Sequence, residues 1–373
     1  MDVALVGPTA SGKSGVALSV VRAVRDSGPD PDGAAGTSSD VELVSVDSMA
    51  VYRGMDLGTT KPPPEVRAEV RYHLVDLVDP DEEFTVTRFQ AGAREAVAGI
   101  AARGNRAVLV GGTGLYLRAV TDGLEFPGRF EGVAAELRAG LDARGPAGTP
   151  ERAAAVAGLH DRLVVLDPVA ASRIDTANER RLVRALEVTL GSGRPFSSFG
   201  PGLERYPPTP VALVGIRPDP AETDRRIGDR WTRMMDAGLL DEVRALATRP
   251  GGLSRTARQA LGYRELLAHV EDGVPLATAM EDAVRRTRQF ARRQWAWFRR
   301  DPRIEWVGPD EDPVAAVVAR LDGRDGGNGR DGGNGRDGGN GRDGGNGRDG
   351  GNGRDGGNAS TGRTGVPRPD PVR

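Results

Sequence analysis

The chain has 373 residues, and its 51 basic and 53 acidic residues give a formal net charge of −2. This length is enough for two domains, and the balanced charge does not by itself indicate a nucleic-acid partner. The absence of cysteine excludes disulfides and cysteine-ligated zinc. No run of about 18 apolar residues occurs. Since no basic leader precedes the first apolar run, we expect a cytoplasmic protein that is not associated with membranes. We also expect a monomer.

Short apolar runs alternate with helical patterns over the first 120 residues, and a further run occurs later. The runs with the composition of buried strands are residues 3–6, 41–46, 107–110 and 211–216. Apolar residues at helical spacing predict helices over 14–24 and 85–102. The runs end in polar or glycine-rich turns. This alternation predicts an α/β fold, with a parallel sheet like that of the P-loop NTPases.

The segment 123–205 has a different pattern, helical and rich in arginine, with 163–166 as its only candidate strand. We therefore expect a helical insertion domain at 123–205. The α/β core would then comprise residues 1–122 and 206–307, with its last helices contacting RNA.

Two segments lack the apolar residues needed for packing. Residues 27–40 are rich in Gly, Ser, Asp and Pro and are expected to form a surface loop. Six copies of GRDGGN occupy residues 323–358 and offer no apolar side chain to bury. We expect residues 320–373 to form a disordered tail for this reason.

The segment GPTASGKS at residues 7–14 matches the phosphate-binding pattern GxxxxGK[ST]. Backbone amides of such a loop surround a phosphate, and the following helix directs its positive end at the charge. Lys13 supplies a cation, and the Ser14 hydroxyl can bind Mg²⁺. The expected phosphate ligands are Gly7, Thr9, Ala10, Ser11, Gly12, Lys13 and Ser14. The flanking strand and helix disfavour a chance match, and the pattern indicates a polyphosphate without specifying ATP.

Two further strand ends bring candidate groups toward this loop, since parallel strands end at the same edge of a sheet. Asp47 and Ser48 follow the second run, and the carboxylate could hold Mg²⁺, accept a proton or simply cap a helix. The third run ends in Gly-Gly-Thr-Gly at 111–114, where Thr113 can donate a hydrogen bond. The alternative for 111–114 is a tight turn without function.

Six segments in order resemble the tRNA dimethylallyltransferases, the bacterial tRNA isopentenyltransferases of the IPP transferase family. They are GPTASGKS (7–14), SVDSMAVYRGMDLGTTKP (45–62), LVGGTGLYLRAV (109–120), NERRLVRALEV (178–188), ALGYRE (260–265) and RTRQFARRQWAWFR (286–299). The resemblance covers nearly all of residues 1–307. It implies transfer of a dimethylallyl group from dimethylallyl diphosphate to N6 of adenosine 37 in tRNAs that read codons beginning with U.

The resemblance also implies roles for individual residues. Asp47 matches the general base that takes a proton from the adenine N6, and Thr113 matches the residue that steadies the bridging oxygen of the leaving group. Arg264 matches a diphosphate contact, and Lys61 lies in the GTxKP segment near the site. Lys13, Arg264 and Mg²⁺ would stabilise the charge of the departing diphosphate.

The tRNA contacts that the resemblance implies involve the anticodon stem-loop. The matching residues are Asp47, Ser48, Met49, Ala50, Arg180, Arg181, Arg184, Arg292, Arg293, Gln294 and Arg299. The sequence departs from the family pattern at Ala50, where many members have glutamine. It also lacks the Pro-Asn turn that the family commonly has before the helix that contains Arg180, and the C-terminal zinc finger of the eukaryotic members is not found in this sequence.

The segment 285–300 supports RNA binding independently of the resemblance. It has seven arginines and no acidic residue, with Thr287, Ala291 and Phe298 on one side of a helical wheel and most arginines on the other. A solvated charged face normally mixes both signs, so unopposed arginines favour a phosphate backbone. Trp295 lies on the apolar side, which favours core packing over base stacking.

Three other functions remain open from the sequence. A prenyl transferase acting on free AMP would keep the phosphate site without needing the insertion or the basic helix. A small-molecule kinase would use ATP at the same loop, but neither a lid arginine pair nor an adenine pocket is identifiable. A non-catalytic nucleotide-binding module would not need Asp47 and Thr113 at two neighbouring strand ends.

Overall fold

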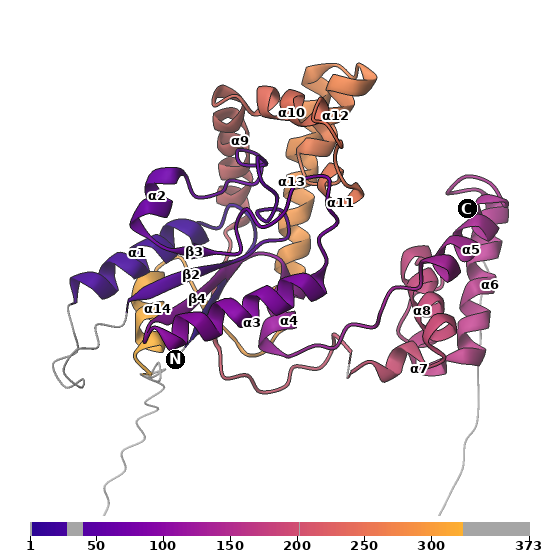
Figure 1. Cartoon of the computed structure of the whole chain (residues 1–373), viewed down its shortest axis with the longest axis horizontal. Helices are drawn as coiled ribbons and strands as arrows, with labels where there is room; N and C mark the ends of the chain where they lie inside the picture. The colour runs from indigo at the N-terminus through magenta and orange to yellow at the C-terminus, as the bar shows by residue number, and fades with distance from the viewer. Residues whose placement is uncertain (1, 28–39, 201, 324–373) are drawn as a thin grey trace, which may run out of the picture. The chain divides into compact units, whose positions relative to one another are not determined.

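The computed structural model describes residues 2–27, 40–200 and 202–323. Within these ranges a single sheet of six parallel strands has the order β3-β2-β4-β1-β5-β6 (Figure 1). The strands are β1 Val3–Val6, β2 Val41–Val46, β3 Tyr72–His73, β4 Arg106–Gly111, β5 Ala212–Ile216 and β6 Ile304–Val307. This sheet confirms the predicted α/β fold with parallel strands.

The predicted strands correspond to β1, β2, β4 and β5, whose ends differ from the prediction by at most one residue. The two strands that were not predicted lie at the sheet edges. β3 has only two residues. In β6 the buried Ile304 is followed by the exposed Glu305, so the sequence has no continuous apolar run. A prediction based on continuous apolar runs therefore missed the two edge strands.

The central strands are buried on both faces, which explains their apolar sequences. In β1, Val3, Ala4, Leu5 and Val6 are each at most 1% exposed. Val3 and Leu5 belong to one hydrophobic cluster and Ala4 and Val6 to the other. Because burial of a Val or Leu side chain contributes about 1.5–3 kcal/mol, helices must cover both faces of this sheet.

One cluster packs the sheet against α1 (Lys13–Asp26) and α14 (Pro313–Leu321). The opposite cluster includes α3 (Val86–Ala102), α4 (Gly114–Thr121) and α13 (Leu276–Phe298). The remaining core helices are α2 Pro64–Glu69, α9 Pro220–Asp236, α10 Leu239–Ala247, α11 Arg255–Arg258 and α12 Tyr263–Asp272. Figure 1 shows α9, α10, α12 and α13 gathered beyond one end of the sheet.

The predicted helices 14–24 and 85–102 are confirmed as α1 and α3. The Thr85 side chain caps α3 by accepting a hydrogen bond of 3.2 Å from the Arg88 amide. On the inward side of α3, Phe89, Ala93 and Ile100 are buried, as their spacing predicted.

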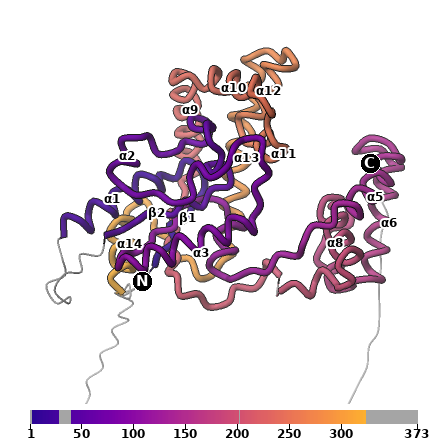
Figure 2. Tube along the Cα trace, viewed as in Figure 1, coloured from indigo at the N-terminus to yellow at the C-terminus, as the bar shows by residue number. Residues whose placement is uncertain are grey.

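Residues 123–205 form helices with their own hydrophobic cluster. The helices are α5 Glu131–Asp142, α6 Pro150–Leu166, α7 Pro168–Ala171, α8 Glu179–Ser192 and the 3-10 helix Phe196–Ser198. Leu141, Leu163 and Leu186 are among the buried residues of this cluster. Figure 2 follows the chain from the core into α5 and from α8 back to the core. The candidate strand 163–166 is wrong, since Thr149 caps α6 and the helical repeat continues through Leu166.

The two chain segments that connect the insertion to the core are joined by a charged cluster. Arg118 donates to Asp122 at 2.6 Å and to the carbonyl oxygens of Leu203 and Arg205. Arg303 donates to the other oxygen of Asp122 at 2.8 Å. The side chain of Asp122 is fully buried, so these bonds are protected from water. The cluster therefore holds the outgoing and returning segments side by side.

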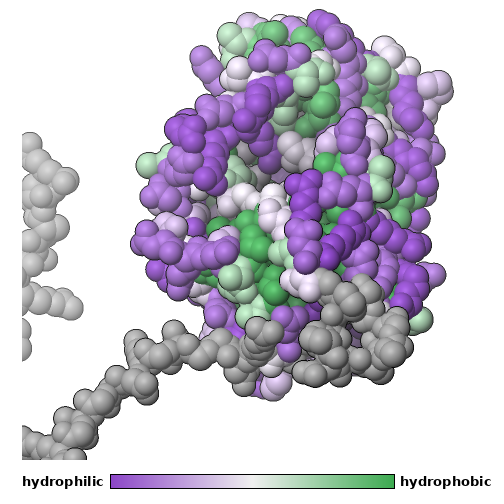
Figure 3. Space-filling model, turned by 90° about the vertical axis from the view of Figure 1, so that its left-hand side faces the viewer, coloured by the Kyte–Doolittle hydropathy of each residue, from purple (hydrophilic) through white to green (hydrophobic). Residues whose placement is uncertain are grey.

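The exterior combines hydrophilic and apolar areas. On the face in Figure 3, hydrophilic residues surround a hollow lined by more hydrophobic ones. Across the described ranges, no helix is both long enough and apolar enough to cross a membrane. Most of the predicted loop 27–40 and of the predicted tail 320–373, namely residues 28–39 and 324–373, falls outside the residues that the structure describes. The predicted start of the tail at 320 is wrong, because α14 continues to Leu321.

Candidate active site

Three functional segments follow three neighbouring strands. β4 lies between β1 and β2, and its last residue, Gly111, is in register with both Val6 and Val46. The phosphate-binding loop follows β1, Asp47 follows β2, and Thr113 follows β4. The sheet therefore brings these groups together at its carboxyl edge, where α/β proteins usually bind ligands.

The loop between β1 and α1 has the backbone of an anion site. Gly12 has a φ of 92°, a conformation that favours glycine, and Ala10 also has a positive φ of 63°. Gly12 precedes α1 without supplying a side-chain cap, so the helix begins with free amide groups. The Ser14 side chain is exposed at the start of α1. These amides and the helix dipole attract a phosphate group.

Lys13 lies within the same loop, and its Nζ donates to the Pro8 carbonyl oxygen at 2.6 Å. Burial lowers the pKa of Lys13 to about 7, while the negative charge of Asp47 opposes this change and Arg230 adds to it. The lysine is therefore poised to take up a proton when an anion arrives.

Within the described residues, only one of the two carboxylate oxygens of Asp47 accepts hydrogen bonds from the protein. Oδ1 accepts hydrogen bonds from the amides of Met49 at 2.7 Å and Ala50 at 3.3 Å. Oδ2 has no hydrogen bond within the described ranges. Residues 48–54 consist of bends, turns and the bridge at Tyr52, and the next helix begins at Pro64, so the alternative in which Asp47 simply caps a helix does not hold. The free oxygen is available to a substrate.

Thr113 lies beside Asp47 and precedes the first turn of α4. Its Oγ1 accepts a hydrogen bond of 3.4 Å from the Ser48 amide. Its own amide donates to the Val46 carbonyl oxygen at 3.4 Å. These bonds tie the loop after β4 to the segment that contains Asp47, so 111–114 is more than an isolated turn.

Arg230 on α9 is a site residue that the sequence analysis missed. Its Nη1 donates to the Thr9 Oγ1 at 3.2 Å. Burial lowers the pKa of Arg230, and the negative charge of Asp47 opposes that change. Arg230 follows the buried Ile227 by three residues and precedes the buried Met234 by four. A cation within the apolar stripe of an amphipathic helix was the available signal.

Two predicted residues lie in different surroundings from those expected. The Arg264 side chain is exposed on α12, and none of the hydrogen bonds or ion pairs in the described ranges involves it. Lys61 is buried, with Nζ at 2.5 Å from Asp76 and 2.7 Å from Asp56. It also donates to the Tyr52 carbonyl oxygen. Lys61 therefore holds the segment that follows Asp47 in place.

The arginines of α13 are largely paired, so the prediction of seven unopposed charges is wrong. Their acidic partners are distant in sequence or lie just before the arginine-rich segment. The pairs are Arg285 with Asp282, Arg286 with Glu265, Arg288 with Asp224 and Arg292 with Asp224. Within the described ranges Arg293, Arg299 and Arg300 have no ion pair and are exposed. These three are the free cations near the C-terminal end of α13.

Gln294 was expected on the RNA face, but its side chain is only 8% exposed. Both ends of its amide group bond to the protein, at Thr9 and Gly112. Both polar ends of the Gln294 side chain are thus occupied within the protein, and its tRNA contact stays a prediction. Trp295 packs against Trp306 with ring centroids 4.7 Å apart, in agreement with the predicted core packing.

In the insertion, Arg180 and Arg181 are exposed at the start of α8. Arg184 instead bonds to Glu187 at 2.6 Å and to the Pro127 carbonyl oxygen at 2.8 Å. Its guanidinium is therefore occupied within the insertion. Of the other predicted RNA contacts, Ser48 and Met49 are half-buried and Ala50 is buried.

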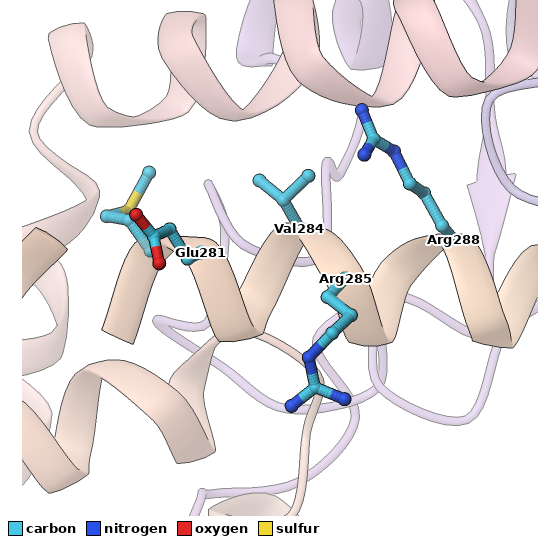
Figure 4. Close-up of a pocket in the computed structure, with 5 residues that line it drawn as sticks. Glu281, Val284, Arg285 and Arg288 are labelled. Atoms are coloured by element: carbon cyan, nitrogen blue, oxygen red, sulfur yellow. The ribbon is translucent and has the colours of Figure 1, made fainter. Parts of the chain in front are cut away.

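A surface pocket of about 400 Å³ lies along α13 and does not include the phosphate-binding loop. Its lining residues are Met280, Glu281, Val284, Arg285 and Arg288. In Figure 4, Val284 and Arg288 point to one side of the helix and Arg285 to the other. The salt bridge from Arg288 to Asp224 at 3.8 Å connects this side with α9.

Known proteins share both the sequence and the fold. The family model described as IPP transferase matches residues 50–301. A tRNA dimethylallyltransferase of Nocardioides sp. is 42% identical over 327 residues, which is 86% of this chain and 97% of that protein. One from Streptomyces coelicolor is 44% identical over 306 residues, 82% of this chain and 89% of that protein.

Solved structures give the same result. The full-length tRNA isopentenylpyrophosphate transferase of Bacillus halodurans has a TM-score of 0.57 and 31% identity, over 86% of this chain and 95% of that one. A eukaryotic dimethylallyltransferase acting on tRNA has a TM-score of 0.64 over 87% of this chain and 80% of its own. Its 20% identity supports similarity of fold alone.

Proposed function

Since the chain belongs to the IPP transferase family, a family of prenyl transferases, we propose that it transfers a dimethylallyl group from dimethylallyl diphosphate to N6 of adenosine 37 in tRNAs that read codons beginning with U. The products would be N6-dimethylallyladenosine and diphosphate. The observation that supports this most is the meeting of a phosphate loop, a free carboxylate oxygen and Thr113 at three adjacent strand ends.

The diphosphate would lie in the loop between β1 and α1. Amides of this loop, Lys13 and Arg230 surround the space in which an anion is favoured. Two cations and a helix N-terminus stabilise a leaving group whose negative charge grows as the bond to carbon breaks. Arg264 remains a proposed diphosphate contact on the basis of the family resemblance, and reaching the loop would require its exposed side chain to turn inward.

The transfer requires removal of one proton and departure of one leaving group. The adenine N6 uses its lone pair to form a bond to the allylic C1, and the C1–O bond breaks so that diphosphate leaves with the electron pair. Asp47 accepts the proton from N6 through its free oxygen and later returns it to water. Thr113, which lies beside Asp47, is suited to donate a hydrogen bond to the bridging oxygen of the leaving group.

The residues present fit a magnesium ion bound through the substrate. The exposed Ser14 hydroxyl lies where the phosphate oxygens would be, and magnesium commonly binds one or two protein oxygens together with phosphate and water. No cluster of three or more acidic or histidine side chains suited to a metal occurs in the described residues. Mg²⁺, when bound, would neutralise part of the diphosphate charge.

The RNA substrate would contact basic residues on two elements. Arg293 and Arg299 are exposed on and just after α13, and Arg180 and Arg181 are exposed on α8. We propose that these arginines bind the phosphates of the anticodon stem-loop, together with Arg292 once its salt bridge to Asp224 opens. A monomer in the cytoplasm would suit this role.

Two alternatives differ in the acceptor or the donor. An enzyme acting on free AMP would need no RNA surface, whereas the helical insertion and the free arginines at the C-terminal end of α13 favour RNA. A small-molecule kinase would transfer phosphate from ATP, and Asp47 beside the loop does not distinguish the two reactions. The family relationship favours prenyl transfer.

Purified protein with Mg²⁺ and labelled dimethylallyl diphosphate is expected to label an anticodon stem-loop with adenosine at position 37. The matched control is the same RNA with guanosine at that position, which offers no N6 amine in the same place. Labelling of free AMP in preference to RNA would support the first alternative. Hydrolysis of ATP without any prenyl transfer would support the kinase.

A further inference from the structure

The buried amide of Gln294 joins two loops of the active site. Its Oε1 accepts a hydrogen bond from the Thr9 amide at 2.7 Å. Its Nε2 donates to the Gly112 carbonyl oxygen at 2.9 Å. Thr9 belongs to the phosphate-binding loop, and Gly112 precedes Thr113. One side chain of α13 therefore bonds to both loops, although these are more than 100 residues apart in sequence.

The packing around this amide leaves no space for another side chain. A Cβ atom at Gly112 would lie 2.3 Å from the Gln294 Nε2 and 3.3 Å from the Gly7 carbonyl oxygen. Real Cβ atoms do not approach so closely. The lack of a side chain at Gly112 thus allows the two loops and the amide of Gln294 to be in direct contact.

Each of the two loops that Gln294 contacts makes a further hydrogen bond to a segment that carries a proposed catalytic or diphosphate-binding residue. On one side, Thr9 accepts a hydrogen bond from Arg230 through its hydroxyl. On the other, Thr113 is tied to the amide of Ser48, which directly follows Asp47. The position of Gln294 therefore influences both the diphosphate cations and the proposed general base.

We propose that Gln294 is a positioning residue that fixes the separation between the diphosphate loop and the loop that contains Thr113. The catalytic consequence of this inference rests on the proposed prenyl transfer. The two hydrogen bonds of Gln294 do not depend on that proposal. The role requires a side chain that accepts one hydrogen bond and donates another. A neutral amide does both at every pH, whereas a carboxylate only accepts.

The variant Gln294→Glu tests this requirement through its pH dependence. The protonated glutamic acid can accept from Thr9 and donate to Gly112, whereas the ionised form faces the Gly112 carbonyl oxygen and adds negative charge beside the diphosphate. Because the site is buried, a carboxyl at this position should have a pKa raised above the ordinary value of about 4.3. We therefore expect the ratio of variant to wild-type activity to fall at least about tenfold as the pH rises from about 5 to about 8.5. The dissociation constant for inorganic pyrophosphate should rise over the same interval.

The matched control is Gln289→Glu, because Gln289 lies on the same helix with an exposed side chain. This variant should follow the wild-type pH profile. At about pH 8.5, where both carboxyls are expected to be ionised, each variant adds one negative charge to α13, and both should bind the anticodon stem-loop with affinities that are similar to each other. Thermal denaturation of both variants at each pH separates loss of folding from loss of activity.

Hydrogen exchange of the wild-type protein provides a second measurement that needs no variant. The Thr9 amide should exchange slowly because it donates to a buried oxygen. Rapid exchange of this amide would overturn the proposal, as would identical pH profiles for the two glutamate variants. A selective loss of RNA affinity in Gln294→Glu, with unchanged pyrophosphate binding, would instead assign Gln294 to the RNA surface.

The outcomes also distinguish this inference from the proposed function. If wild-type protein transfers no prenyl group, the proposed function fails. Pyrophosphate binding that still depends on pH in Gln294→Glu, but not in Gln289→Glu, would then leave the positioning role of Gln294 intact.

Discussion

The two carboxylate oxygens of Asp47 have different roles, one in the local backbone structure and one in the proposed reaction. The amides of Met49 and Ala50 both donate to Oδ1, and Oδ2 is left for a substrate. An asparagine can orient its carbonyl oxygen toward the same two amides. Loss of the basic oxygen can therefore be tested without loss of the turn.

Asp47→Asn is expected to reduce turnover by about 10²–10⁴-fold, the usual contribution of a general base. Binding of inorganic pyrophosphate should not weaken, because the substitution removes a negative charge near Lys13 and Arg230. Single-turnover transfer to the stem-loop and calorimetric titration with pyrophosphate measure the two effects. Turnover at the wild-type rate would exclude Asp47 as the base.

Lys13 predicts a pH dependence of diphosphate binding. Burial lowers its pKa to about 7 in the unliganded protein. Below that pH the ammonium is already charged, and above it anion binding must first restore the proton, so affinity should decline as the pH rises past about 7. Bound diphosphate should raise the pKa of this lysine, with uptake of a proton.

Titration of pyrophosphate in buffers of different ionisation enthalpy measures that proton uptake. Lys13→Arg is the control, because an arginine stays protonated at every pH of the experiment. Protons that pyrophosphate itself gains or loses on binding contribute equally in the two proteins. The proton uptake of the wild type at about pH 8 should exceed that of the variant. Equal uptake in the two proteins would contradict a lowered pKa.

At the scale of single elements, α13 has two distinct sides. Its inner side contributes Gln294 to the active site, and Thr287, Ala291 and Phe298 to the core. Its outer side bears the arginines. Asp224 of α9 lies at 3.8 Å from Arg288 and 3.4 Å from Arg292, so a single carboxylate neutralises part of this side. RNA phosphates would compete with that carboxylate.

Asp224→Asn is expected to raise stem-loop affinity by about 2–10-fold at low salt, because Arg288 and Arg292 become available to phosphates. The salt dependence of binding should also become steeper. Asp229→Asn is the matched control, since Asp229 lies on the same helix and pairs with Arg225 instead. Filter binding over a salt series tests both variants, and an equal response would argue against a specific role for Asp224.

At the scale of the whole molecule, the insertion and the core have separate hydrophobic clusters. Their connecting segments are joined by Arg118, Asp122 and Arg303 at the edge of the core. Because Arg118 bonds to carbonyl oxygens on the returning segment, the two ends of the insertion lie within side-chain reach of each other. A short linker could therefore connect them.

Replacement of residues 125–202 by a short Gly-Ser linker is expected to leave a folded core. Pyrophosphate affinity should change by less than about threefold, and stem-loop affinity should fall by at least about tenfold because the phosphate contacts of Arg180 and Arg181 are lost. Circular dichroism melting checks the fold before either titration. A shortened protein that folds but binds RNA as tightly as the full chain would remove the insertion from the RNA-binding surface.

The features that the sequence determined by itself are those that depend on residues close together in the chain. The strands β1 and β2, the phosphate loop at 7–14 and the helices α1 and α3 follow from apolar periodicity, glycine and lysine at fixed spacing, and a cap at Thr85. Burial of a strand and the conformation of a turn depend on such local patterns. The positions of Asp47 and Thr113 followed from the rule that parallel strands end at one edge.

Other features were decided only by the tertiary structure. Arg230 reaches Thr9 from α9, Gln294 reaches it from α13, and Asp224 neutralises arginines that appeared unopposed in the sequence. Each of these contacts joins helices or loops whose packing cannot be read from spacing along the chain. A hydrogen bond or salt bridge acts over about 3–4 Å, so its partners are known only when the fold has brought distant segments together.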